Sequence, residues 1–196
     1  MRLEELTELH YITHMDNVVS ILRLGILSNK KVSRVAHVSV AMQEIQARRA
    51  KVVVPGGRKL HEYVNLYICA RNPMLYKRQA QYLDLCVLRV STDVLYLPGV
   101  VVTDGNASSD YVRFAAAPSG LRIVDQTLTF ADDWTDADPI QYYRKKSAKC
   151  AEVLVPDKVD PRFTVGAYVS CQEARAKLNR LVPDMSITIN GHMFFR

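Results

Sequence analysis

Glu152 is the carboxylate in this sequence that is best placed for chemistry. It precedes the apolar run Val153-Leu154-Val155, which predicts a short strand that Pro156 ends. A carboxylate at the mouth of a strand could stabilise positive charge on a sugar or accept a proton. A glutamate at such a position is usually an exposed strand end, so its role depends on the polar groups around it.

A pair of adjacent arginines, Arg48 and Arg49, lies in the most basic part of the chain. Side chains of adjacent helical residues point about 100° apart, so at most one of the two is expected to enter a site. Residues 30–59 contain one acidic residue, Glu44, and eight basic residues: Lys30, Lys31, Arg34, Arg48, Arg49, Lys51, Arg58 and Lys59. Such a stretch suits a nucleic acid or a pyrophosphate, or is simply a solvated surface.

Three further clusters could bind a nucleotide. The run from His10 to Asn17 brings polar side chains to a helix N-terminus, which suits a pyrophosphate or ribose, although Thr13, Asp16 and Asn17 could be plain helix caps. Residues 71–76 could wall a pocket for a flat ring or form a packed turn. The run Tyr142-Tyr143-Arg144-Lys145-Lys146 combines rings with cations, as single-stranded nucleic acid requires.

The elements that must position these groups alternate between helix and strand. Strands are predicted at 9–13, 64–70, 86–90, 100–102 and 152–155, and helices at 17–24, 36–49, 139–150 and 171–181. Residues 103–139 look irregular, and a closing hairpin is predicted around Asn190-Gly191. We therefore predict one α+β domain over residues 1–196. No G-x-G-x-x-G motif follows a strand, which argues against a Rossmann site.

Composition narrows the class of protein. The chain has 196 residues, 48% hydrophobic and 23% charged, with a net charge of +6. The four cysteines are widely spaced without C-x-x-C pairs, so no zinc site is predicted. No apolar run is long enough to span a bilayer, and the acidic start does not resemble a signal peptide. We expect a cytoplasmic protein without a membrane partner or a metal.

Seven short motifs occur in an order that resembles the DarT family of DNA ADP-ribosyltransferase toxins. They span nearly the whole chain: Thr13-His14-x-Asp16-Asn17, Ile21-Leu22-x-x-Gly25, Ile45-Gln46-x-Arg48-Arg49, Leu60-His61-x-Tyr63-Val64, Asn72-Pro73-Met74-Leu75-Tyr76, Lys145-Lys146 and Ala151-Glu152-x-Leu154-Val155. The resemblance implies an ADP-ribosyltransferase fold, a split β-sheet core flanked by helices. It also implies transfer of ADP-ribose from NAD to a thymidine ring nitrogen in single-stranded DNA.

The resemblance also implies roles for individual residues. Glu152 and Arg49 would be catalytic, with Arg48 as a substitute for Arg49. NAD as substrate would be held by His10, Tyr11, Thr13, His14, Asn17, Gly25, Leu27, Arg49, Tyr67 and Met74. DNA would be held by Tyr111, Arg113, Tyr142, Arg144, Lys145 and Lys146. The family commonly has Tyr-His where this chain has His10-Tyr11, so either residue could replace the family histidine.

The expected partners are single-stranded DNA and a DarG-type macrodomain antitoxin that removes the ADP-ribose from DNA. Three alternatives stay open at this stage. The acceptor could be guanosine, or it could lie in RNA or protein with the same NAD site. The chain could also be a non-catalytic nucleic-acid-binding domain, which would have no use for Glu152.

Overall fold

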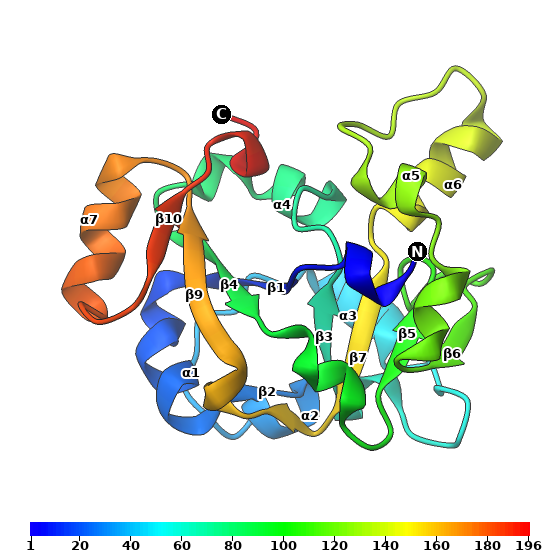
Figure 1. Cartoon of the computed structure of the whole chain (residues 1–196), viewed down its shortest axis with the longest axis horizontal. Coiled ribbons are helices and arrows are strands. Elements are labelled where there is room, and N and C mark those ends of the chain that lie inside the picture. Colours follow the sequence, from blue (N-terminus) through cyan, green and yellow to red (C-terminus); the bar gives the residue numbers. More distant parts are fainter.

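Eight strands form one mixed sheet in the order β10-β9-β4-β1-β3-β7-β5-β6 (Figure 1). A computed structural model describes all 196 residues. The strands are β1 (Leu9–His14), β3 (Tyr63–Tyr67), β4 (Leu85–Val90), β5 (Val101–Thr103), β6 (Phe114–Ala116), β7 (Glu152–Pro156), β9 (Thr164–Val169) and β10 (Ile187–Ile189). A separate two-stranded sheet joins β2 (Ile26–Leu27) to β8 (Lys158–Val159). The α+β prediction, with strands throughout one domain, is confirmed.

The sheet is divided into two halves that meet at a single residue pair. Strand β1 pairs with β4 from Leu9 to His14, and β3 pairs with β7 along its whole length. Between β1 and β3, however, only His10 and Tyr67 are partners. The two strands diverge beyond this pair, which leaves room between the halves of the sheet.

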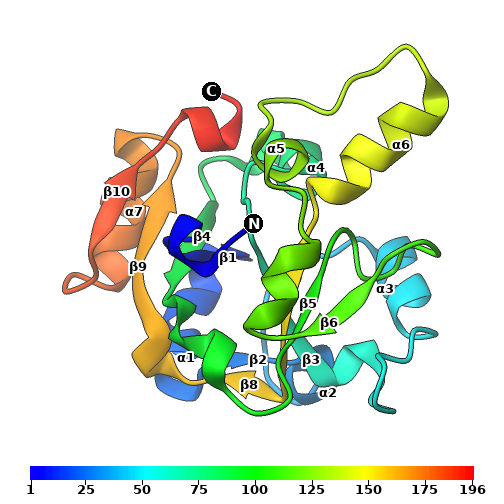
Figure 2. The same cartoon turned by 45° about the vertical axis from the view of Figure 1, so that its right-hand side comes forward.

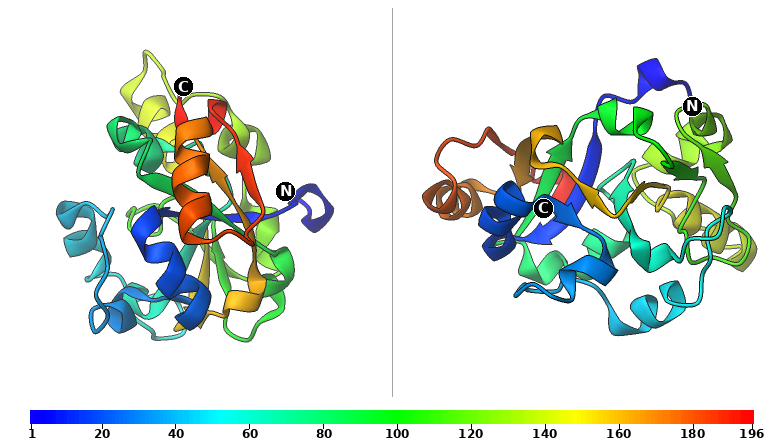
Figure 3. Two further views of the ribbon diagram at one scale, coloured as in Figure 1. Left: turned by 90° about the vertical axis from the view of Figure 1, so that its left-hand side faces the viewer. Right: turned by 90° about the horizontal axis from the view of Figure 1, so that it is seen from below.

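Seven α-helices flank the sheet. They are α1 (Val18–Leu24), α2 (Asn29–Val32), α3 (Gln43–Arg49), α4 (Pro73–Lys77), α5 (Gln126–Phe130), α6 (Pro139–Ala148) and α7 (Gln172–Leu181). Short 3-10 helices are η1 (Leu3–Glu5), η2 (Met15–Asn17), η3 (Leu60–Glu62), η4 (Gln79–Gln81), η5 (Thr92–Tyr96), η6 (Ser119–Ile123), η7 (Pro161–Phe163) and η8 (His192–Phe194). Helix α7 lies outside β9 and β10 (Figure 3), whereas α6 stands out from the body on the opposite side (Figure 2).

Both faces of the sheet bury apolar side chains. Adjacent residues of a strand point to opposite faces, and in β4 Leu88 belongs to the large core while Val87 belongs to a smaller one. The large core contains 27 buried residues, including Ile21 of α1 and Leu178 of α7. The smaller core packs Leu75 of α4 and Phe194 of η8 against the other face. Apolar packing therefore covers both faces of the sheet. This packing holds the strands, and with them the polar residues at the strand ends, in place.

The helix predicted at 36–49 is shorter than expected. Only Gln43–Arg49 is helical, and residues 36–42 are extended without regular structure. The backbone of this segment bonds to distant side chains: Val38 bonds to Asn17, and the carbonyls of Val40 and Ala41 accept from Arg78. These partners replace the hydrogen bonds of a helix, and no local periodicity reveals them.

The predictions for the middle and the end of the chain need two corrections. Residues 103–139 contain β6, η6 and α5, so this stretch is more ordered than predicted. The predicted closing hairpin is wrong, because β10 pairs in parallel with β9 and residues 192–194 form η8. Strand β9 (Thr164–Val169) was not predicted from the sequence. It pairs with β4 on one side and with β10 on the other, so β10 pairs with β9 and not with residues 193–195.

Two further features bear on function. None of the helices is long and apolar enough to cross a membrane. No group of three or more His, Cys, Asp or Glu side chains is arranged to hold a metal ion.

Candidate active site

A cavity of about 700 Å³ opens between the two halves of the sheet and the elements that cover them. Its walls come from β1, α1, the extended segment 35–42, α3, β3, α4, the segment 106–111 and α6. This volume is in the range of pockets that bind small molecules and cofactors. The cavity therefore brings together most of the clusters that the sequence singled out.

Arg49 and Glu152 form a two-point ion pair at the wall of this cavity. Arg49 Nη1 donates to Glu152 Oε1 over 3.0 Å, and Nη2 donates to Oε2 over 3.1 Å. Both residues are buried, with 6% and 1% exposure respectively. Arg49 lines the cavity but Glu152 does not. The guanidinium thus covers the carboxylate, and a substrate that reaches Glu152 must displace or share Arg49.

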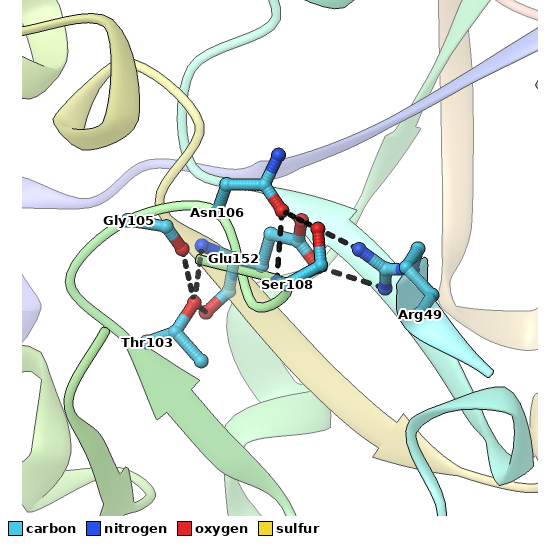
Figure 4. Close-up of polar contacts among 6 residues, drawn as sticks. All are labelled: Arg49, Thr103, Gly105, Asn106, Ser108 and Glu152. Carbon is cyan, nitrogen blue, oxygen red and sulfur yellow. Dashed lines mark hydrogen bonds and ion pairs between the residues drawn. The ribbon is translucent and has the colours of Figure 1, made fainter. Parts of the chain in front are cut away.

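Strand β7 and the turn after β5 fix the position of Glu152 (Figure 4). Its backbone N–H donates to Thr103 Oγ1 over 3.1 Å, and that hydroxyl donates to Gly105 O over 2.7 Å. A Cβ atom on Gly105 would lie 2.5 Å from Ser147 Oγ and 3.1 Å from Ser147 O. Glycine at 105 therefore lets α6 pack directly onto the turn beside Glu152.

The pair dominates the electrostatics around it. Burial is the largest single influence on Arg49 and lowers its pKa, but the charge and hydrogen bonds of Glu152, with smaller contributions from Tyr67 and Cys150, together raise the net pKa. Tyr67 is the cross-strand partner of Glu152, and burial together with that carboxylate raises the pKa of Tyr67 well above its ordinary value. Burial and then the charge of Arg49 lower the pKa of His61. The site thus holds a charged pair beside a neutral phenol and a neutral imidazole.

Asn17 ties the extended segment 36–42, hereafter the strap, to the start of α1. Its Nδ2 donates to Val38 O over 2.8 Å, and its Oδ1 accepts from Val38 N–H over 2.9 Å. The same amide nitrogen bonds to Thr13 Oγ1 over 3.1 Å. Asn17 is 8% exposed and makes no cap hydrogen bond to its own helix. Its amide imitates a backbone pairing and holds the strap across the cavity.

Arg78 holds the other end of the strap. Its Nε and Nη2 donate to Val40 O and Ala41 O over 3.1 and 3.3 Å. Residues 37–42 all line the cavity. The strap is therefore a wall of the site that two side chains from outside it hold in place.

The residues of β1 that were predicted to bind NAD divide into two groups. Tyr11 and Thr13 line the cavity, and burial raises the pKa of Tyr11 to about 12. The structure places His10 and His14 outside the cavity. His10 Nε2 lies 3.3 Å from Glu8, and His14 Nδ1 accepts from the N–H of Asp16 over 3.2 Å. Tyr11, not His10, is the member of the pair that can contact a ligand there.

The other residues predicted to contact NAD lie around the cavity. Gly25, Leu27, Tyr67 and Met74 all line it. Gly25 has a φ of 90°, and a Cβ atom there would lie 2.3 Å from Val159 O. Only glycine permits this close approach, which fixes the end of α1 against β8.

The residues predicted to contact DNA divide into two groups. Tyr111, 94% exposed, and Lys146 line the cavity. Tyr142, Arg144, Lys145 and Arg113 do not line it. Two of the basic side chains are held by acids: Arg113 Nε by Asp104 over 2.6 Å, and Lys145 Nζ by Asp136 over 2.8 Å.

Five of the eight bases in the stretch 30–59 form ion pairs, which their sequence did not reveal. Their partners come from distant elements or from the same helix: Lys30 with Glu62, Lys31 and Arg58 with Asp157, Arg48 with Glu44, and Arg49 with Glu152. Arg34, Lys51 and Lys59 have no ion-pair partner. The charge available to a polyanion in this stretch is therefore much smaller than its composition suggests.

Several residues that shape the site were not predicted from the sequence. They are Thr103, Gly105, Arg78, Lys77, Ser147 and Tyr143, which hold Glu152, the strap or the mouth of the cavity. Most lie in segments without a distinctive pattern. Tyr143 belonged to a run that the sequence singled out. Only the structure shows that Tyr143, and not Tyr142, lies on the face of the helix that lines the cavity.

Comparison with known proteins agrees with this geometry. A family model described as "ssDNA thymidine ADP-ribosyltransferase, DarT" matches residues 10–195. The chain belongs to the DarT family. A DNA ADP-ribosyl transferase of Thermus sp. is 35% identical over 156 residues, which are 74% of this chain and 74% of that protein. A DNA ADP-ribosyl transferase–DNA ADP-ribosyl glycohydrolase fusion protein of Thermosipho africanus is 32% identical over 93% of this chain, which spans 47% of the fusion.

Solved DarT structures share the fold. Thermosipho africanus DarTG in complex with ADP-ribose has a TM-score of 0.85 at 30% identity, covering 96% of this chain and 51% of that one. Thermus sp. 2.9 DarT in complex with ADP-ribosylated single-stranded DNA has a TM-score of 0.83 at 27% identity, covering 99% of both chains. The same DarT with NAD+ gives 0.78 at 26% identity, covering 97% of this chain and 98% of the other. The chain thus shares its overall fold with the solved DarT structures.

Proposed function

We propose that this chain transfers ADP-ribose from NAD to a thymidine base in single-stranded DNA, and that it acts as a toxin that blocks DNA replication. The observation that carries the proposal is the buried Arg49–Glu152 pair at the wall of the cavity. Membership of the DarT family and the DarT structures with NAD+ and ADP-ribosylated DNA support the choice of donor and acceptor. We assign the reaction to the cytoplasm, in keeping with a DNA substrate.

The reaction exchanges one bond at the ribose for another. The bond from ribose C1′ to nicotinamide breaks, its electron pair leaves with nicotinamide, and positive charge builds on the sugar. A thymine ring nitrogen forms the new bond to C1′ and loses its proton. Glu152 is assigned both to stabilise the sugar, through a ribose hydroxyl, and to accept that proton.

NAD carries the charges needed to open the Arg49–Glu152 pair. Breaking a buried pair by removing one partner costs about 3–5 kcal/mol, because the other charge stays uncompensated. The pyrophosphate of NAD is an anion that can take up Arg49, and the nicotinamide riboside is a cation that can approach Glu152. Exchange of partners frees the carboxylate only when the donor is bound. Arg49 is then available to the pyrophosphate or to negative charge that develops on thymine.

The NAD contacts are assigned to the cavity-lining residues among those predicted from the sequence. These are Tyr11, Thr13, Asn17, Gly25, Leu27, Arg49, Tyr67 and Met74. Asn17 is assigned to hold the strap against the donor, and Tyr11 takes the place of the family histidine through its hydroxyl. His10 and His14 have no assigned contact, because they lie outside the cavity.

The test is a labelling assay with defined acceptors. Purified protein is incubated with NAD and a single-stranded oligonucleotide that contains one thymidine, and the mass is measured for addition of one ADP-ribose. Parallel reactions contain an oligonucleotide with guanosine in place of thymidine, an RNA, and a protein mixture. A thymidine methylated at the acceptor nitrogen should not be labelled. Labelling of RNA or protein alone, or of no acceptor, would overturn the proposal.

The antitoxin partner is assigned from the same family. In the Thermosipho africanus relative, the transferase is fused to a DNA ADP-ribosyl glycohydrolase. We assign to this chain a macrodomain partner of the DarG type that removes the mark. Expression of the wild-type chain should arrest growth, co-expression of such a glycohydrolase should restore it, and the Glu152→Gln chain should not arrest growth.

A further inference from the structure

One face of α6 forms part of the cavity. Tyr143, Lys146 and Ser147 line the cavity, and Cys150 follows them just beyond the helix. Their spacing of three and four residues places them on the same side of the helix. Tyr142, Arg144 and Lys145 point elsewhere and do not line the cavity. The aromatic and basic run therefore presents one ring and one cation to the cavity.

The ring of Tyr143 is exposed but held in orientation. Tyr143 is 67% exposed. Its ring centroid lies 5.3 Å from that of Tyr142 with an interplanar angle of 76°, an edge-to-face contact. Tyr142 is itself fixed, because Lys146 Nζ donates to its hydroxyl over 3.1 Å. By contrast, Tyr111 at the same cavity has no aromatic neighbour within contact.

The charges at this part of the cavity favour an anion. Lys146 and Lys77 line it, and neither has a carboxylate partner. Lys145, which points away, is the lysine of α6 that is paired with an acid. The two lysines that line the cavity without a carboxylate partner, Lys146 of α6 and Lys77 of α4, therefore accompany the exposed ring.

The loop before α6 is anchored both to the end of that helix and to the body of the protein. Lys149, fully buried, donates to Ala131 O over 2.6 Å. Trp134 packs edge-to-face on Tyr76 and Phe195, with centroids 5.6 and 6.2 Å away. These contacts hold the loop that leads into α6, so the ring of Tyr143 is displayed from a fixed helix.

We propose that Tyr143 stacks on the base of a nucleotide next to the acceptor thymidine, while Lys146 holds a phosphate of the same strand. An exposed, oriented ring beside unpaired cations is the arrangement that binds single-stranded nucleic acid. The proposal rests on the proposed function, since it assumes DNA as acceptor. It adds a contact that positions the strand outside the reacting centre and tolerates any base at that position.

The test compares protein variants with abasic DNA. Binding of a labelled single-stranded oligonucleotide with one thymidine is measured by anisotropy for wild type, Tyr143→Ala and Tyr143→Phe. Stacking contributes enough that Tyr143→Ala should weaken binding about tenfold, whereas Tyr143→Phe should bind like wild type. Ile140→Ala is the matched control, because Ile140 is 75% exposed on the same helix and does not line the cavity.

Abasic sites identify the partner of the ring. One flanking nucleotide at a time is replaced by an abasic site, and wild type should lose about tenfold in affinity at one neighbouring position. Tyr143→Ala should lose nothing further at that position. The inference would be overturned if the abasic site lowered the DNA affinity of both proteins equally, or if Tyr143→Ala bound DNA as tightly as wild type. It would also be overturned if Tyr143→Ala raised the KM for NAD and not that for DNA. If wild type labels DNA and any of these results appears, the proposed function stands and only the stacking contact fails.

Discussion

Arg49 covers Glu152: the guanidinium bonds to both carboxylate oxygens, at 3.0 and 3.1 Å, and only the arginine reaches the cavity. The carboxylate that we assign to catalysis is thus paired before any substrate arrives. This arrangement makes separate predictions for activity and for stability.

Glu152→Gln should abolish transfer while NAD still binds. The amide keeps the shape of the side chain but cannot accept the thymine proton or stabilise a cationic sugar to the same extent. A general base contributes about 10²–10⁴-fold, so single-turnover labelling of DNA should fall by at least that factor. NAD affinity is measured in parallel by calorimetry. Near wild-type labelling by this variant would remove Glu152 from the chemistry.

The stability of Arg49 and Glu152 variants should be non-additive. Arg49→Met and Glu152→Leu alone each leave a buried charge unpaired and should cost about 3–5 kcal/mol. The double variant buries two apolar side chains instead and should recover most of that loss while remaining inactive. Urea unfolding of the four proteins measures the coupling. Simple addition of the two losses would mean that the pair does not form in solution.

Asn17→Ala should loosen the strap and weaken NAD binding. The substitution leaves the N–H and C=O of Val38 without their partners, which costs about 1–3 kcal/mol, equivalent to roughly tenfold or more in KM for NAD. Protease cleavage within residues 36–42 should become faster, and NAD should slow it again. Val19→Ala, at a 52% exposed position of the same helix, is the control. A raised KM for DNA with an unchanged KM for NAD would contradict this role.

DNA binding should depend on Lys146 more than on Lys145. Lys146 faces the cavity without an acidic partner, whereas Lys145 is held by Asp136. For single strands, each phosphate contact contributes about 0.7 to the slope of log Kobs against log salt concentration. Lys146→Ala should lower the slope by about that amount, and Lys145→Ala should change it less. Equal changes would show that the ion pair with Asp136 opens on binding.

Glu8 should make the fold sensitive to acid. Burial by itself raises the pKa of Glu8. Hydrogen bonds from His10, Tyr168 and Arg89 together lower it by more than that, so that the pKa is about 2 instead of the ordinary 4.5. A carboxylate with a lowered folded pKa stabilises the protein above about pH 4.5, and this contribution is lost as pH falls toward 2. Glu8→Gln should therefore flatten the dependence of Tm on pH in that window. An unchanged slope would show that Glu8 is not held this way.

Local structure was largely predictable from the sequence, since it depends on neighbouring residues. The apolar run after Glu152 predicted β7, the polar start before Val18 and the glycine at 25 delimited α1, and Pro139 opened α6. Side-chain periodicity and the backbone limits of glycine and proline determine such elements within a few residues. The sequence also singled out Glu152 and Arg49, and its ordered motifs indicated the family.

The partners of the functional side chains were decided by the tertiary structure alone. Glu152 is 103 residues from Arg49, and Val38 is 21 residues from Asn17. Packing of the two halves of the sheet brings these groups together, and it buries Arg49 while leaving Arg48 paired with Glu44 at the surface. The same packing pairs five of the eight bases of the stretch 30–59 with acids and turns a single face of α6 toward the cavity. Local sequence patterns carry no information about contacts between segments so far apart. Many residues of the site could therefore be listed in advance, but not their partners.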